Sequence, residues 1–325
     1  MNGTRVTVLR GGPSVEHDIS MLTGLGVLQA LSETPHTVKD IVISKKGEWL
    51  LNGYVKKPQD ALIDTDVVFI ALHGAYGEDG TVQRILERLA IPYTGSGPFA
   101  SNLAMSKVHT KNSLKDLGIK MPKHIRITRE GASDISRVAS SVTTLFGPQY
   151  FIKPEKGGSS IGTRFVESPV RLADEIRRAL DESDELIIEE RIKGKEATVG
   201  VLENYRTDRH YVLPPTEIIP PEASGYFAAN VKYTGDTKEI CPGLFSKKEK
   251  QDLLDAARKV HQTLNLRHYS RSDFIVAEDG VYFLEVNTLP GLTAESLFPK
   301  SMLAVGATYT ELVSHLIGLA QNTKR

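Results

Sequence analysis

The chain has 325 residues, 40% of them hydrophobic, and its 40 basic residues balance 40 acidic ones. A chain of this length exceeds what one compact core usually holds, so we expect two or three domains. No block of five or six like charges occurs, which excludes an electrostatic site for nucleic acid or an anionic membrane and favours a small-molecule partner.

No apolar stretch reaches the roughly 18 to 20 residues of a membrane helix, and no signal-peptide core follows the N-terminus. We therefore expect a cytosolic protein. The single cysteine, Cys241, excludes an intramolecular disulfide and is interpreted as a small buried residue rather than a catalytic thiol.

The first third of the chain alternates apolar runs with helical patterns, as is typical of a parallel sheet with crossover helices. Strands are predicted in RVTVL, DIVIS and DVVFIALHG, the last apolar enough to be buried on both faces. The segment TVQRILERL predicts a helix whose apolar residues share one face: Val82, Ile85, Leu86 and Leu89. The proline- and glycine-rich segment IPYTGSGP then predicts a domain boundary near residue 97.

Two further domains are predicted, divided near residue 187. The second contains a helix over residues 102–117, the extended segment MPKHIRIT, the strand QYFIKP, the helix VRLADEIRRALDE and the strand ELIIEE. The third contains the strand ATVGVL, an amphipathic helix through Leu253 and Leu264, a hairpin and a closing helix over residues 309–320. Between its elements, the irregular stretch from Pro214 to Pro242 has the length of a functional lid or a disordered loop.

The hairpin RSDFIVAEDGVYFLEVN allows its pairing to be counted. A three-residue loop over residues 278–280, with glycine at its left-handed position, pairs Ile275 with Phe283 and Asp273 with Glu285. Because side chains alternate between the faces of a strand, the opposite face is predicted to be apolar. Its members would be Phe274, Val276, Tyr282, Leu284 and Val286.

On this register four polar side chains share one face of the hairpin: Arg271, Asp273, Glu285 and Asn287. Two carboxylates directly opposite each other repel, and a bound cation would relieve the repulsion. Oxygen ligands of this kind are those that magnesium prefers. The alternative is a solvated face that tolerates its charges. The strongly apolar opposite face favours the ion site.

Two other segments carry candidate polar groups. In QYFIKPEKGGSSIG a buried strand ends at Lys153, and a loop of small residues follows whose N–H groups could hold phosphate. An ordinary turn is the alternative, and the lysine at the strand end favours phosphate. His73, at the end of an apolar strand, could bind substrate or complete a turn, and residue chemistry leaves both open.

Six motifs occur in order along the chain: GGPSVEHDIS, LHGAYGEDG, FIKPEKGGSSIG, IIEERIKGKE, KYTGDTKEICP, and SRSDFIV with LEVNTLPG. On these motifs the chain resembles the D-alanine:D-alanine ligases of the ATP-grasp superfamily over essentially its whole length. The resemblance implies an α/β ATP-grasp fold preceded by a Rossmann-like (pre-ATP-grasp) parallel-sheet domain. Residues 1–97 would form that substrate domain, 98–186 the small central lid domain, and 187–325 the metal and acceptor domain.

The resemblance also implies roles for individual residues. Those expected to bind ATP are Lys107, Lys153, Ser160, Glu189, Ile192, Glu196 and Lys232. Those expected to bind two Mg²⁺ ions, or Mn²⁺ in their place, are Asp273, Glu285 and Asn287. Those expected to hold the amino acids are Glu16, His73, Arg271 and Ser296. Those expected to act in catalysis are Glu16, Ser159, Tyr233, Arg271 and Gly291.

The activity implied is ATP-dependent ligation of two D-alanines through an acyl phosphate, for peptidoglycan precursors, by a cytosolic homodimer. The chain departs from the family pattern in its lid, where GYFAANVKY replaces a run like FYDYEAKY, and at Ser106, where aspartate is usual. The altered lid leaves open another acceptor, such as D-lactate, D-serine or another amino acid. A silent nucleotide-binding regulator is disfavoured because the metal and phosphate residues are all present.

Overall fold

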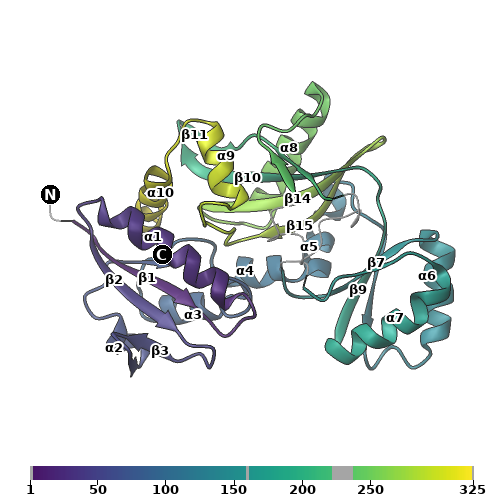
Figure 1. Cartoon of the computed structure of the whole chain (residues 1–325), viewed down its shortest axis with the longest axis horizontal. Helices are drawn as coiled ribbons and strands as arrows, with labels where there is room; N and C mark the ends of the chain where they lie inside the picture. Colours follow the sequence, from purple (N-terminus) through teal and green to yellow (C-terminus); the bar gives the residue numbers. More distant parts are fainter. Residues whose placement is uncertain (1–2, 159–160, 222–236, 324–325) are drawn as a thin grey trace.

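The computed structural model describes residues 3–158, 161–221 and 237–323, which form three lobes with one sheet each (Figure 1). In Figure 1 the N-terminal lobe lies at the left, the C-terminal lobe at the top, and the central lobe extends to the right. Helices α4 and α5 lie where the three lobes meet.

The N-terminal lobe is built on a five-stranded sheet in the order β4-β3-β2-β1-β5. Strand β1 pairs in parallel with β2 and β5, which confirms the parallel sheet predicted from the alternation of strands and helices. All four residues of β5 are buried, as its continuous apolar sequence predicts. The elements of this lobe are β1 (Arg5–Gly11), α1 (His17–Ser32), β2 (Thr37–Ile43), β3 (Trp49–Leu51), β4 (Tyr54–Lys56), α2 (Pro58–Ala61), β5 (Val67–Ile70) and α3 (Thr81–Arg88).

The central lobe is an antiparallel sheet in the order β6-β9-β7-β8, and α6 and α7 bury their apolar sides against it. Helix α6 was not predicted, because its sequence ISRVASSVTTLF is rich in residues of low helix propensity. The division predicted near residue 187 falls within β9. The elements are β6 (His124–Thr128), α6 (Ile135–Phe146), β7 (Tyr150–Pro154), β8 (Arg164–Val166), α7 (Pro169–Glu182) and β9 (Glu185–Glu190).

The C-terminal lobe is an antiparallel sheet in the order β13-β12-β10-β14-β15, and β11 also pairs with β10. Strands β12 and β13 lie in the stretch predicted to be irregular, so that prediction is wrong at residues 216–219 and 238–240. The elements are β10 (Lys195–Tyr205), β11 (Asp208–Val212), β12 (Thr216–Ile219), β13 (Lys238–Ile240), α8 (Lys247–Thr263), β14 (Tyr269–Ala277), β15 (Gly280–Asn287), α9 (Leu297–Ala304) and α10 (Tyr309–Asn322).

The segment predicted as one helix over residues 102–117 is two helices and a short turn: α4 (Pro98–Met105), α5 (Lys107–Leu114) and the 3-10 turn η1 (Lys115–Leu117). Ser106 separates the helices because its backbone is extended, with φ −86° and ψ 112°. Its Oγ accepts the N–H of His109 at 3.1 Å and so caps α5. A new helix therefore begins at Lys107, which fixes the direction of that side chain.

The register of the β14–β15 hairpin differs from the predicted one at its tip. Ala277 pairs with Gly280, so the loop has two residues, and Ile275 pairs with Tyr282 rather than Phe283. A β-bulge between Asp273 and Phe274 then absorbs one residue, and Asp273 still pairs with Glu285 as predicted.

The bulge also changes which side chains of β15 reach the core. Phe283, which is fully buried, packs there with Phe274 at 5.9 Å between ring centroids. Leu284, predicted to lie on that apolar face, lines the large cavity described below. The expected grouping of Tyr282 and Leu284 with the core residues is therefore wrong.

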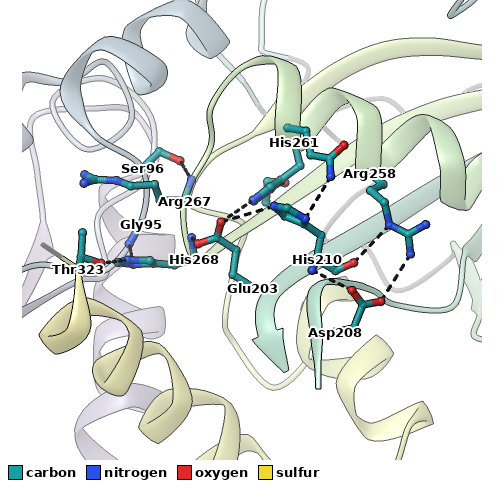
Figure 2. Close-up of polar contacts among 12 residues, drawn as sticks. Gly95, Ser96, Glu203, Asp208, His210, Arg258, His261, Arg267, His268 and Thr323 are labelled. Carbon is teal, nitrogen blue, oxygen red and sulfur yellow. Dashed lines mark hydrogen bonds and ion pairs between the residues drawn. The ribbon is translucent and has the colours of Figure 1, made fainter. Parts of the chain in front are cut away.

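A polar junction joins the N-terminal and C-terminal lobes (Figure 2). The Nδ1 atom of His268 accepts the N–H of Gly95 at 3.0 Å, and its Nε2 lies 2.8 Å from the Oγ1 of Thr323. The Glu203 carboxylate accepts the backbone N–H of His268 at 2.6 Å and faces His261 at 3.6 Å. His268 thus holds three segments that are far apart in the sequence.

No single helix in the described ranges is long and apolar enough to cross a membrane. Helices α9 and α10 satisfy the length and composition criteria only as a pair bent by 104°. Both bury apolar side chains in the core shared with the N-terminal lobe.

We predict that His268 makes stability depend on pH below neutrality. Burial lowers the pKa of His268 to about 4, whereas an unfolded histidine titrates near 6.5. Between these pH values His268 is protonated in the unfolded chain and neutral in the folded chain. The free energy of unfolding therefore falls by roughly 3 kcal/mol as the pH drops from 6.5 to 4. The substitution His268→Asn tolerates the local φ of +65° and removes the titrating group.

Thermal unfolding of both proteins at several pH values between 7 and 4 checks this prediction. The wild-type midpoint should fall more steeply with acidification than that of His268→Asn. Parallel curves would show that the residue does not contribute to the pH dependence.

Candidate active site

The hairpin places two carboxylates opposite each other at the wall of a cavity of about 340 Å³. Asp273 is on β14 and Glu285 on β15, and each side chain is about one fifth exposed, at 20% and 21%. Thr198 Oγ1 donates to Asp273 Oδ1 at 2.5 Å, and Arg271 donates to both Asp273 oxygens at 3.1 and 3.2 Å. Asp273 is therefore held in one orientation, opposite the Glu285 carboxylate.

These residues fit a divalent cation by the chemistry of their donors. Asp273 and Glu285 offer carboxylate oxygens, and Asn287, which pairs with Arg271, offers an amide oxygen. Hard oxygen donors of this kind suit Mg²⁺. The site has two carboxylates and one amide, and no group of three or more His, Cys, Asp or Glu side chains in the described ranges could hold a metal ion.

Lys107 faces the Glu285 carboxylate from the start of α5. Its side chain is 8% exposed, and its Nζ donates to the carbonyl of Gly157 at 2.6 Å and lies 3.6 Å from Glu285 Oε2. The lysine therefore joins the glycine-rich segment to the hairpin. Such an ammonium is suitably placed for a phosphate that bridges the two.

A buried carboxylate, Glu189 on β9, is held between two lysines. Its oxygens lie 2.8 Å from Lys111 Nζ and 2.7 Å from Lys153 Nζ. Burial opposes ionisation, but the two ammonium charges outweigh it and lower the pKa of Glu189. Lys111 was not predicted as a site residue. The signal for it is its position four residues after Lys107, which puts both lysines on the same side of α5.

The cavity beside these groups has a volume of about 340 Å³ and lies between the central and C-terminal lobes. The residues predicted for ATP that line it are Lys107, Lys153, Glu189, Ile192 and Glu196, and the predicted metal and oxyanion residues that line it are Arg271, Asp273 and Glu285. Residues far apart in the sequence therefore meet at one cavity.

A smaller recess of about 30 Å³ adjoins the first and shares Lys107 and Glu285 with it. Glu16 lines this recess with Asn287. Gly74 has φ +69°, a conformation that favours glycine, and a Cβ at this position would lie 2.6 Å from Glu16 Oε2. The N-terminal lobe thus contributes a carboxylate to the edge of the site.

Glu78 also lines the recess and was not predicted. Burial and the nearby charge of Glu16 raise the pKa of Glu78 to about 8. Its Oε1 accepts the N–H of Gly74 at 2.9 Å. The motif LHGAYGEDG that contains His73 also contains Glu78, which is the signal that could have identified it.

His73 is 5% exposed, and both its ring nitrogens have partners. Nε2 lies 2.8 Å from Thr23 Oγ1, and Nδ1 lies 3.1 Å from the carbonyl of Leu289. The ring therefore joins the N-terminal lobe to the turn after β15, beside the recess.

That turn contains the remaining predicted residues of the described ranges. A Cβ on Gly291 would lie 2.8 Å from Ser296 Oγ, so the backbone of the turn approaches this side chain closely. Ser296 is the N-cap residue of α9, and its Oγ accepts the N–H of Thr293 at 3.1 Å. Ser159, Ser160, Lys232 and Tyr233, with the lid run that contains the last two, lie outside the described residues.

Two family models match the chain. The D-ala D-ala ligase N-terminus matches residues 5–61 and 52–96, and the D-ala D-ala ligase C-terminus matches residues 113–318. This chain belongs to the D-alanine–D-alanine ligase family.

Individual relatives match over nearly the whole length of both proteins. The D-alanine–D-alanine ligase of Syntrophobacter fumaroxidans is 37% identical over 97% of this chain and 97% of its own. That of Leptospira interrogans serovar Lai is 34% identical over 96% of this chain and 97% of its own.

Solved structures in this family share the fold. D-alanyl-alanine synthetase A from Vibrio cholerae superposes with a TM-score of 0.86 at 27% identity, covering 99% of this chain and 100% of its own. VanG D-Ala:D-Ser ligase from Enterococcus faecalis superposes with a TM-score of 0.83 at 28% identity, covering 98% and 99%. The ATP-grasp fold predicted from the sequence motifs is confirmed.

We predict that Lys111→Met destabilises the ligase by about 3 kcal/mol, because it removes one partner of a fully buried ion pair. Urea unfolding should show the loss. Lys123→Met is the matched control, since Lys123 is 66% exposed and lies 3.9 Å from Glu190. That control should change stability by less than about 0.5 kcal/mol. Equal losses in both variants would contradict the importance of the Lys111 pair.

Proposed function

We propose that this chain uses ATP to join two D-alanines into D-alanyl-D-alanine for peptidoglycan precursors. The observation that carries the proposal is the facing pair Asp273 and Glu285 beside Lys107, at the wall of a 340 Å³ cavity in a chain of this ligase family. A cation and two phosphates need such a combination of fixed carboxylates and ammonium groups.

ATP binding is proposed to follow the cavity from the central lobe to the hairpin. Glu189 and the backbone at Ile192 would contact the adenine, and Glu196 the ribose. The phosphates would be held by the cationic and hydroxyl side chains among the proposed ATP residues: Lys107, Lys153, Ser160 and Lys232. Asp273, Glu285 and Asn287 would hold Mg²⁺. The ion would supply positive charge that neutralises the phosphates.

In the first step the carboxylate of the first D-alanine attacks the γ-phosphate of ATP, which forms an acyl phosphate and releases ADP. Glu16 would hold the ammonium of this substrate, with His73 nearby, and so direct its carboxylate at the γ-phosphate. Lysine side chains would balance the charge that spreads over the transferring group. Their fixed positions avoid reorganisation during the transfer.

In the second step the amine of the second D-alanine attacks the acyl carbon and phosphate leaves. Ser296 would receive the carboxylate of this substrate. The Arg271 guanidinium and the N–H of Gly291 would stabilise the oxyanion that forms. Ser159 and Tyr233 would complete a hydrogen-bonded link with Glu16, and the lid would exclude water from the acyl phosphate. The homodimer and the cytosolic location implied by the resemblance stay predictions.

A second candidate acceptor is D-serine. The specific observation in its favour is the close structural match to the VanG D-Ala:D-Ser ligase, together with the altered lid sequence GYFAANVKY. Acceptor choice depends on contacts to one small side chain, which are worth only a few kcal/mol. The family fold therefore leaves room for either acceptor.

We predict that purified protein with ATP and Mg²⁺ releases phosphate when D-alanine is the only amino acid. Mass spectrometry should detect D-alanyl-D-alanine. A panel of D-serine, D-lactate and L-amino acids, each added with D-alanine, compares the acceptors. Mixed product in large excess over the homodipeptide would favour the second candidate, and ATP binding without turnover would contradict both.

We predict that Glu285→Gln lowers turnover by at least about 1000-fold, because several kcal/mol of charge stabilisation are lost with the carboxylate. Steady-state phosphate release at saturating ATP and D-alanine measures this. Glu278→Gln removes an exposed carboxylate at the tip of the same hairpin and should leave turnover within about twofold. Near-normal turnover of Glu285→Gln would exclude the metal assignment.

A further inference from the structure

One buried carboxylate near the cavity has no role in the chemistry described so far. Glu155 follows β7 and is 3% exposed, yet it does not line the cavity or the adjoining recess. A carboxylate is costly to bury unless its hydrogen bonds compensate. Its partners therefore indicate what it does.

Glu155 and Ser106 together satisfy the first three N–H groups of helix α5. The N–H of Lys107 donates to the Glu155 carbonyl at 3.1 Å, and the N–H of Val108 donates to Glu155 Oε1 at 3.4 Å. Ser106 Oγ donates to the same Oε1 while accepting the N–H of His109. The N-terminus of a helix favours negative charge, so this carboxylate stabilises the start of α5.

The residues that follow Glu155 contact the same helix start. Lys156 forms an isolated antiparallel β-bridge with Ser106, and Gly157 accepts the Lys107 Nζ at 2.6 Å. On the other side, the N–H of Glu155 donates to the carbonyl of Glu185 at 3.0 Å, which anchors it to the central sheet. Glu155 thus links both the start of helix α5 and residues 156–158 to the central sheet.

We infer that Glu155 is a positioning residue that holds Lys107 and residues 156–158 as one phosphate-binding unit. The inference rests on the proposed function, in which Lys107 contacts ATP phosphates. Glu155 acts through Lys107: without its carboxylate the lysine and the loop would move independently, and ATP binding would have to order both. Ordering additional groups on binding lowers affinity.

The two oxygens of Glu155 differ in a way that allows a sharp test. Oε1 accepts from Ser106 and Val108, whereas Oε2 is buried without a hydrogen-bond partner in the described ranges. Glu155→Gln keeps an acceptor at Oε1 but places a buried NH₂ group at the Oε2 position, which costs stability. Glu155→Ala removes the acceptor altogether. ATP affinity and stability should therefore respond differently to the two substitutions.

The experiment measures KM for ATP, KM for D-alanine, kcat and the thermal unfolding midpoint for both variants and for Ser106→Ala. Glu155→Ala should raise KM for ATP about tenfold, because one hydrogen bond to a charged group is lost. KM for D-alanine should stay within about twofold of wild type. Glu155→Gln should lower the unfolding midpoint yet keep KM for ATP within about threefold of wild type. Ser106→Ala should lie between the two in KM for ATP.

Glu185→Ala serves as the control, because it removes a carboxylate of the same lobe whose side chain pairs at the surface with Arg126. Its KM for ATP should not change. If KM for ATP follows the unfolding midpoint across all variants, Glu155 is only structural and the inference is overturned. An unchanged KM for ATP in Glu155→Ala overturns it as well.

Hydrogen exchange separates this inference from the proposed function. In the absence of ATP, Glu155→Ala should speed exchange at the N–H groups of residues 107–109 and 156–158, whereas Glu155→Gln should not. Faster exchange in a protein that makes no dipeptide would contradict the proposed ligase activity alone. Dipeptide synthesis with unchanged exchange and unchanged KM for ATP would contradict the positioning role alone.

Discussion

The repulsion between Asp273 and Glu285 is the constraint on which the rest of the site depends. Two carboxylates directly opposite each other across a strand pair destabilise a hairpin unless positive charge lies close by. Arg271 donates two hydrogen bonds to one, and Lys107 lies 3.6 Å from the other. The hairpin supplies one of these partners itself, and helix α5 supplies the other, Lys107, which is also the group that a phosphate would meet.

The same balance of charge extends into the central lobe. Glu189 is an anion between two lysines, and its burial makes each of those contacts stronger than it would be in water. Lys153 reaches the cavity from β7 and Lys111 lies wholly inside, so only one of the two ammonium groups can meet a ligand. The buried lysine stabilises the carboxylate, and the carboxylate in turn orients the accessible lysine.

Three lobes are needed because no single sheet supplies all of these groups. Glu16 follows β1 and Glu78 follows β5, at the carboxyl ends of two neighbouring parallel strands, where ligands commonly bind. The antiparallel hairpin brings the acidic pair from the C-terminal lobe, and the central lobe closes the cavity from the other side (Figure 1). Helices α4 and α5 connect them, so the break at Ser106 positions Lys107 for all three.

Local patterns in the sequence determined most of the elements and the pairing of Asp273 with Glu285, because strand alternation and turn chemistry are properties of neighbouring residues. Ordered motifs were sufficient to predict the fold and the family. Only the tertiary structure decided the position of the β-bulge, which buries Phe283 in the core in place of Leu284, since core packing selects which side chain is buried. It also revealed Lys111, Glu78 and Glu155, whose roles depend on buried partners from distant segments, and burial of a charge cannot be read from its neighbours along the chain.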